Sequence, residues 1–244
     1  MTYLTGFHAM EEFVQSGSTK GATLIVAAAG PRIKKILELA RKAGLSTRSA
    51  TARELDTLAP DNRGAVIQLE EAPSSTELDL ETWLRSPLPA NALVIMLDHI
   101  EDPHNLGAIL RSADVFAADL VIMPERRAAK ETDTVARASA GAVAYVPVAT
   151  VPNLARAVEL LKEAGFWTYA ADMGGQNLPV TELSGRVAVV MGGEGSGVSR
   201  LLKERCDGAL SIPQFGHVDS LNVSVAAGVL MYELRRRLGP PARA

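Results

Sequence analysis

The chain has 244 residues and a formal net charge of −3, with 47% hydrophobic and 22% charged residues, a composition typical of a globular protein. Its longest apolar runs are about six residues, far short of the roughly 20 that a membrane-spanning helix needs. The first ten residues lack the basic start and apolar stretch of an export signal, so we expect a cytoplasmic protein without a membrane anchor.

The chain has a single cysteine, Cys206, which excludes an internal disulfide and any metal site built from several cysteines. Of its four histidines, the closest pair is His99 and His104, and this spacing does not place both rings on one helix face. We therefore predict no metal site.

The charge is unevenly distributed. Residues 20–63 contain nine Lys and Arg against four acids, a local net charge of +5. A basic face for an anionic partner and an ordinary solvated helix surface explain this excess equally well.

A segment rich in proline divides the chain. Residues 71–91 hold three of the 13 prolines and show little periodicity, which predicts a linker at 73–90 between domains at 1–72 and 91–244. The first domain has strand-like runs at 23–27 and 65–69. It also has one amphipathic helix face, so we expect a small α/β domain. That face consists of Ile33, Ile36, Leu37 and Ala40.

The second domain alternates apolar runs with helical patterns, which predicts a buried parallel sheet. The apolar runs are 93–97, 120–123, 166–170, 187–191 and 209–212. The helix faces are Leu106, Ile109, Leu110 and Ala113 in one helix, and Leu154, Ala157, Val158 and Leu161 in another that stops at Gly165.

Polar residues follow the first of these strands, where the glycine-rich turn of a dinucleotide-binding domain is missing. Asn105 stands near the start of a helix, so it is either a helix N-cap or a site residue. Arg111 lies beside the apolar face of the same helix, and a structural ion pair and a functional role are both open for it.

A glycine-rich loop comes late in the chain, at residues 192–197. It lacks the lysine of a phosphate-binding P-loop and carries Glu194 at its centre, which favours a cationic or amino-bearing ligand over a phosphate. The alternative is a tight strand-to-helix turn whose glycines supply positive φ angles.

A third segment, residues 212–224, precedes a largely apolar helix. It contains Ser220, Asn222 and Ser224, and a helix cap explains one of these residues but not all three. The three arginines at 235–237 are predicted to be the solvated last turn of that helix rather than an RNA-binding patch.

The segments DPHNLGAILRSA (102–113), VMGGEGSG (190–197) and IPQFGHVDSLNVSVA (212–226) together resemble the three motifs of the SpoU/TrmH family of RNA ribose 2′-O-methyltransferases, in the SPOUT superfamily. The stretch YLTGFHA (3–9) resembles the start of the L30e-like substrate-binding domain that precedes many members. The resemblance implies an α/β fold: a parallel-sheet SPOUT domain with a C-terminal trefoil knot behind a small α/β domain.

The same resemblance implies the cofactor S-adenosylmethionine, bound at Gly192, Ile212 and Leu221. It implies a homodimer in which both subunits contribute to each site. The implied substrate is structured RNA, with ribosomal RNA favoured over transfer RNA and guanosine as the favoured nucleotide. Catalytic or substrate roles fall on Asn105, Arg111, Glu194, Ser220 and Asn222.

The chain departs from the family pattern in two places. Asn62-Arg63-Gly64 stands where a His-Gln-Gly stretch is usual, and Ala144 stands where an acid is expected. Both departures put the particular RNA in doubt and leave the catalytic motifs intact. A noncatalytic RNA-binding protein of the same fold and a nucleotide-phosphate enzyme using the 192–197 loop remain the alternatives.

Overall fold

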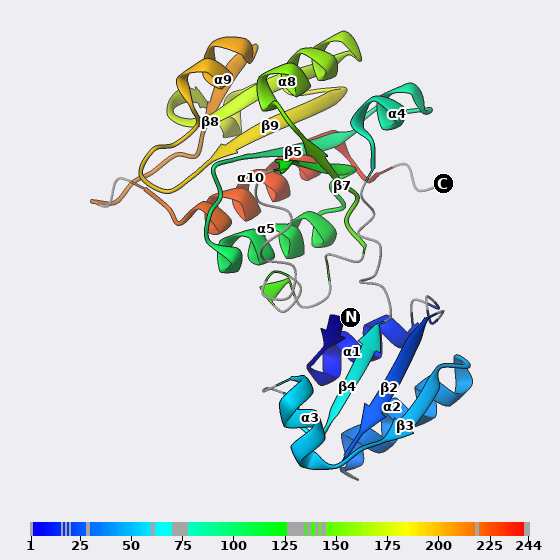
Figure 1. Cartoon of the computed structure of the whole chain (residues 1–244). Coiled ribbons are helices and arrows are strands. Elements are labelled where there is room, and N and C mark those ends of the chain that lie inside the picture. Colours follow the sequence, from blue (N-terminus) through cyan, green and yellow to red (C-terminus); the bar gives the residue numbers. More distant parts are fainter. Residues whose placement is uncertain are drawn as a thin grey trace. The chain divides into compact units, whose positions relative to one another are not determined.

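The structure is a computed structural model (Figure 1) that describes residues 2–15, 17, 19, 21–27, 30–59, 62–69, 78–125, 135, 138, 139, 142, 145–217 and 220–241. The chain divides into two compact units, residues 1–75 and 76–244. Each unit has its own hydrophobic core. Ala144 lies outside the described residues.

The first unit is a four-stranded sheet in the order β1-β4-β2-β3, in which β2 and β3 are parallel and β4 is antiparallel to β1 and β2. The predicted strands and helix are confirmed, whereas β1 and β3 were not predicted because one is very short and the other buries no side chain. The elements are β1 (Thr2–Leu4), α1 (Phe7–Gln15), β2 (Ala22–Val26), α2 (Pro31–Lys42), β3 (Ser46–Ser49), α3 (Ala52–Leu58) and β4 (Ala65–Leu69).

The second unit contains a six-stranded sheet in the order β10-β8-β9-β5-β6-β7, and every neighbouring pair is parallel. This confirms the predicted parallel sheet. The strands are β5 (Leu93–Asp98), β6 (Leu120–Pro124), β7 (Val148–Val151), β8 (Phe166–Asn177), β9 (Arg186–Gly192) and β10 (Gly208–Ser211). The short β7 was not predicted.

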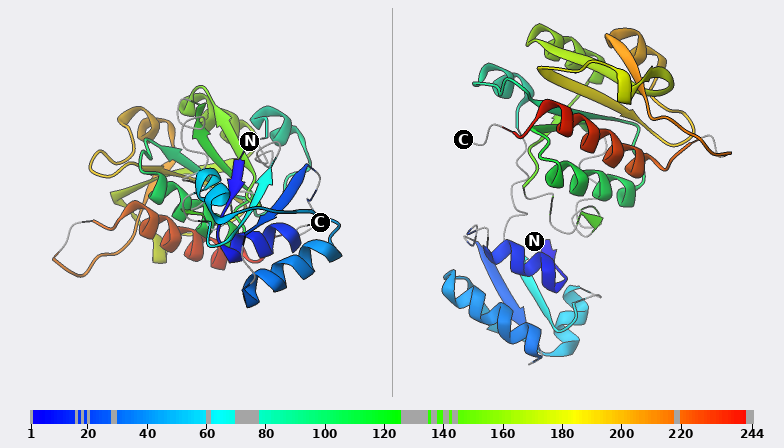
Figure 2. Two further views of the ribbon diagram at one scale, coloured as in Figure 1. Left: turned by 60° about the horizontal axis from the view of Figure 1, so that its bottom comes forward. Right: turned by 180° about the vertical axis from the view of Figure 1, so that it is seen from behind.

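Helices cover both faces of this sheet (Figure 2), so the central strands β5, β6 and β9 bury side chains on two sides and read as continuous apolar runs. In β5, Leu93, Ile95 and Leu97 face one core, whereas Val94 and Met96 face the other. The first core packs against α5 (Pro103–Val115) and α10 (Val223–Leu238), with η2 (Leu178–Val180) at its edge; the second packs against α4 (Leu80–Arg85), α8 (Leu154–Glu163) and α9 (Arg200–Arg205). None of the helices in the described part of the chain combines the length and apolarity needed to cross a bilayer.

Residues 78–90 differ from the predicted linker, because they pack on the second unit. Asp79 caps α4, whose Leu80 is buried and whose Trp83 ring lies 6.1 Å from that of Phe166. The guanidinium of Arg186 donates to the carbonyls of residues 88 and 89, at 3.2 and 3.0 Å. A single six-residue helix shows too little periodicity to stand out among prolines.

The C-terminal turn of α10 also differs from the prediction of a solvated surface. Arg235 is only 10% exposed, pairs with Asp119 at 3.0 Å and donates to the carbonyl of Ala117 at 2.6 Å. Arg237 donates to the carbonyl of Thr181 at 2.6 Å. These two arginines fasten the end of α10 to neighbouring segments, and only Arg236 is mostly solvated, beside Glu233.

Candidate functional site

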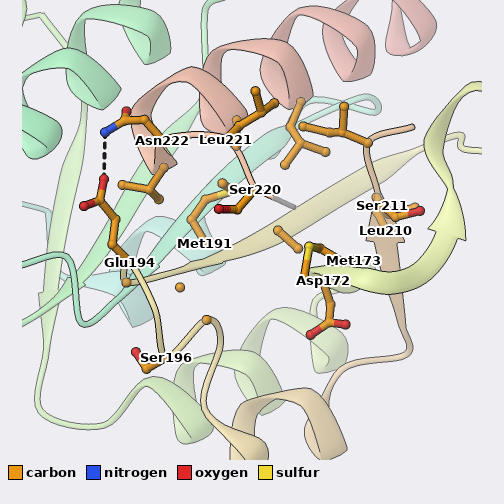
Figure 3. Close-up of a pocket in the computed structure, with 18 of the residues that line it drawn as sticks. Asp172, Met173, Met191, Glu194, Ser196, Leu210, Ser211, Ser220, Leu221 and Asn222 are labelled. Atoms are coloured by element: carbon orange, nitrogen blue, oxygen red, sulfur yellow. Dashed lines mark hydrogen bonds between the residues drawn. The ribbon is translucent and has the colours of Figure 1, made fainter. Parts of the chain in front are cut away.

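A cavity of about 620 Å³ opens in the second unit (Figure 3), a volume within the usual range for small-molecule sites. Its walls come from the 192–197 loop, the segment after β10 and the start of α10. The three residues predicted to bind a cofactor, Gly192, Ile212 and Leu221, all line it, as do Glu194, Ser220 and Asn222.

The 192–197 loop folds back on itself, which requires glycine for two different reasons. A Cβ on Gly192 would lie 2.0 Å from the carbonyl carbon of Gly197, and one on Gly193 would lie 2.3 Å from the carbonyl oxygen of His99. Gly195 and Gly197 have φ angles of +82° and +62°. The two interpretations of the 192–197 loop, a tight turn and a ligand-binding loop, therefore do not exclude each other, because the tightly turned loop also forms a wall of the cavity.

Asp98, at the end of β5, holds the backbone just after the 192–197 loop by a hydrogen bond to Ser199. This role was not predicted from the sequence. The carboxylate of Asp98 is 2% exposed; Oδ2 accepts the N–H of Ser199 at 2.8 Å, and Oδ1 lies 2.5 Å from Nδ1 of His99. A carboxylate ending an otherwise apolar strand was the available signal.

One hydrogen-bond network joins the three motifs. Oε1 of Glu194 accepts from Nδ2 of Asn105 at 3.1 Å and from Nδ2 of Asn222 at 2.7 Å. The Asn222 amide also donates to Oδ1 of Asn105 at 2.9 Å. The N-cap of α5 is Asp102, which accepts the N–H of His104, so the interpretation of Asn105 as a cap is wrong.

Asn222 itself caps α10. Its Oδ1 accepts the N–H groups of Ser224 and Val225 at 3.0 and 3.3 Å and the hydroxyl of Ser224 at 2.6 Å. Ser224 is thus part of the cap, whereas Ser220 lines the cavity. Figure 3 shows Glu194 and Asn222 together at one end of the cavity, with Asp172 and Met173 toward the other.

Arg111 is not part of this cavity. It is exposed, six residues beyond Asn105 and hence about 9 Å farther along the helix axis. Within the described part of the chain it has no hydrogen-bonding or ionic partner, so the structure supplies no ion pair for it. It shares a face of α5 with Val115, whose side chain is 66% exposed.

Three further cavity residues, Asp172, Met173 and Lys203, were not predicted. Ala209 and Leu210 of β10 pair with residues 170 and 176 of β8, so residues 171–175 bulge out of the ladder at the cavity. Hydrogen bonds from Lys203 and from the N–H of Gly174 lower the pKa of Asp172, against a smaller effect of burial, and keep it ionised. No group of three His, Cys, Asp or Glu side chains suited to a metal occurs among the described residues.

A parallel α/β sheet with a cavity walled by a glycine-rich loop and a helix start defines an α/β protein that binds a small organic ligand. The model of the SpoU rRNA methylase family matches residues 92–232, and that of the RNA 2′-O ribose methyltransferase substrate-binding domain matches residues 3–73. The chain therefore belongs to the SpoU rRNA methylase family, the TrmH-related RNA methyltransferases.

Individual relatives agree with this assignment. An uncharacterized tRNA/rRNA methyltransferase of Borreliella burgdorferi is 39% identical over 216 residues, covering 85% of this chain and 95% of the relative. A Bacillus subtilis protein named as a TrmH family tRNA/rRNA methyltransferase is 39% identical over 209 residues, covering 85% and 84%. The fold matches the AdoMet-bound rRNA methyltransferase of Sinorhizobium meliloti with a TM-score of 0.76 at 22% identity, over 98% of this chain and 88% of that one.

Proposed function

We propose that the protein transfers a methyl group from S-adenosylmethionine to a ribose 2′-hydroxyl of structured RNA. The observation that carries this proposal is the joining of Asn105, Glu194 and Asn222, one from each motif, at one end of the 620 Å³ cavity. S-adenosylmethionine has a sulfonium cation joined to a methyl group, to a chain that ends in an amino and a carboxylate group, and to adenosine, whose base has apolar faces. A cavity lined by the carboxylates of Glu194 and Asp172 and by apolar side chains fits such a ligand.

The cofactor supplies an already activated methyl group, so the protein's task is to position the ribose and to manage one proton. We assign cofactor binding to Gly192, Ile212 and Leu221, and ribose binding to Ser220 and the amides of Asn105 and Asn222. We assign to Glu194, the carboxylate of the network, the acceptance of the proton of the attacking hydroxyl.

Arg111 takes a different role. A guanidinium has a pKa of about 12.5 to 13.8, which makes proton acceptance by Arg111 costly. We assign it to an RNA phosphate and to the alkoxide that develops on the ribose oxygen. Because Arg111 lies outside the cavity of its own chain, it serves this role across a subunit interface, at the cavity of a second copy.

An exposed apolar face supports such a homodimer. Val225, Val229 and Tyr232 recur on one side of α10 and are 51%, 40% and 55% exposed. Helix α10 packs along α5, where Val115 and Arg111 share an exposed face. We propose that two copies pack through α5 and α10, and that the C-terminal segment forms the trefoil knot of the family.

Ribosomal RNA is the proposed substrate, with guanosine favoured, in the cytoplasm. The first unit matches a substrate-binding domain of ribose methyltransferases. A separate RNA-binding domain is better suited to a large folded RNA than to a transfer RNA. Transfer RNA is the alternative substrate, and a noncatalytic RNA-binding protein is the alternative function.

The test is transfer of labelled methyl from S-adenosylmethionine to ribosomal and transfer RNA by the purified protein, with nucleoside mass spectrometry to locate the methyl on the ribose. Arg111→Ala should abolish turnover and leave cofactor affinity in calorimetry nearly unchanged. Arg200→Ala, a change at a side chain that is 90% exposed on α9, is the control and should retain full activity. Lost cofactor affinity in Arg111→Ala would move Arg111 to the cofactor site. Absence of transfer by the unmodified protein would favour a noncatalytic role.

A further inference from the structure

The turn at residues 62–64 is fixed by hydrogen bonds of one buried side chain. The side chain of Asn62 is 6% exposed and makes three hydrogen bonds. Its amide donates to Oδ1 of Asp56 at 2.8 Å and to the carbonyl of Ala59 at 2.9 Å, and its oxygen accepts the N–H of Gly64 at 2.7 Å. The turn is therefore fixed by a buried side chain.

Between these two residues, Arg63 is held in the left-handed region, with φ at +50°. This conformation is uncommon for a residue with a Cβ and costs conformational free energy there, whereas glycine would adopt it without strain. The guanidinium is exposed, and among the described residues it has no acid to pair with. The turn thus holds an exposed guanidinium that no described acid neutralises.

The topology brings two further arginines to the same edge of the sheet. Parallel strands β2 and β3 end there, and the antiparallel β4 begins there, two residues after Arg63. The helices that follow β2 and β3 also begin at this edge, with Arg32 in the first turn of α2 and Arg53 in the first turn of α3. Figure 1 shows α3 beside the start of β4.

Of the residues that the structure describes, the two acids near this edge, Glu54 and Asp56, already have partners. Glu54 pairs with Arg48 at 2.6 Å, and Asp56 accepts the amide of Asn62. Arg32 lies over the ring of Phe7, at 5.8 Å from its centroid, which positions its stem without neutralising its charge. The three exposed arginines are here called the arginine edge, and none of them pairs with an acid among the described residues, on a chain whose net charge is −3.

We propose that the arginine edge, Arg32, Arg53 and Arg63, is the surface through which the first unit binds the phosphate backbone of the substrate RNA. The guanidinium fork matches phosphate oxygens, and three such groups along one edge suit consecutive phosphates of a folded strand. This inference rests on the proposed RNA methyltransferase function, and it assigns the first unit's contribution to residues outside the three motifs.

The chain offers a matched control at the other end of α2. Arg41 and Lys42 are exposed there, and Arg41 lies about 13 Å along the helix from Arg32. Arg32→Gln with Arg63→Gly removes two charges from the arginine edge, and glycine at 63 preserves the positive φ of the turn. Arg41→Gln with Lys42→Gln removes two charges from the opposite end.

Methyl transfer by the full chain is measured with protein-free bacterial ribosomal RNA or with unfractionated transfer RNA, whichever accepts methyl from the unmodified protein. The edge pair should raise KM for RNA more than tenfold with kcat nearly unchanged. It should also lower the slope of log affinity against log salt by about two, whereas the control pair should change KM less than about twofold. Arg53→Gln alone should raise KM in the same direction, which keeps the test valid if the edge pair unfolds.

The outcomes separate this inference from the function beneath it. Equal changes in KM for the edge pair and the control pair would mean that only net charge matters, and would overturn the arginine edge while leaving methyl transfer intact. Absence of methyl transfer by the unmodified protein would instead reject the proposed function, and the arginine edge with it.

Discussion

The amide of Asn222 serves two parts of the structure with its two atoms. Its oxygen caps α10 by accepting the N–H groups of Ser224 and Val225, and its nitrogen donates to Glu194 and Asn105. Asn222 is therefore both a helix cap and a site residue. A substitution can separate these two roles only if it keeps the side-chain oxygen and replaces the nitrogen.

Asn222→Asp makes this separation. Aspartate is an equally good N-cap, so the melting temperature should stay close to that of the unmodified protein. The donor to Glu194 is lost and a second carboxylate faces it, so kcat/KM for methyl transfer should fall about 10- to 100-fold. Asn222→Ala, measured alongside, should lose both activity and about 1 kcal/mol of unfolding free energy. Full activity in Asn222→Asp would show that the amide donor is dispensable.

The sequence indicated Asn105, Glu194 and Asn222 as site residues, but not which atoms meet. These residues lie 89 and 28 positions apart along the chain, and only the order of the parallel strands brings their segments together. Asp172 could not be predicted, because its place at the cavity depends on a jump in register between β8 and β10 that no local pattern records.

At the scale of elements, the 192–197 loop is most tightly constrained at Gly192, where an added Cβ would meet its nearest backbone atom at 2.0 Å. Because a Cβ there would meet backbone atoms of residues 197 and 198 at 2.0 to 2.3 Å, Gly192→Ala must displace the loop. We expect the affinity for S-adenosylmethionine, measured by calorimetry, to fall at least about tenfold, which is about 1.4 kcal/mol. Gly216→Ala is the control, since a Cβ at that position meets nothing within 4 Å. Equal affinities in both variants would contradict the proposed role of this loop.

Elements buried on two faces could be predicted from sequence, and elements with little buried surface could not. Strand β5 is buried at all six positions and was predicted almost to its ends, whereas β3 exposes all four of its residues and gave no apolar signal. Helix α4 is short and lies among prolines, so its buried Leu80 was not recognised as part of a core.

On the scale of the whole chain, the boundary between the two units predicts which fragment of the protein folds by itself. Every described residue that lines the cavity lies between positions 171 and 230, within the second unit. A fragment of residues 76–244 should therefore keep the intact protein's affinity for S-adenosylmethionine. It should lose RNA affinity, because it lacks the first unit with its arginine edge.

A fragment of residues 91–244, which begins where the sequence placed the second domain, should behave differently. It lacks the main-chain hydrogen bond from Leu78 to Val148, at 2.7 Å, and the cover that Leu80 and Trp83 give to the core. Loss of a buried leucine typically costs about 2 to 5 kcal/mol, and the partly buried Trp83 is lost with it, so urea unfolding should show this fragment to be at least about 2 kcal/mol less stable than residues 76–244. Equal stability of the two fragments would mean that α4 contributes nothing to the core and that residues 78–90 serve only to connect the units.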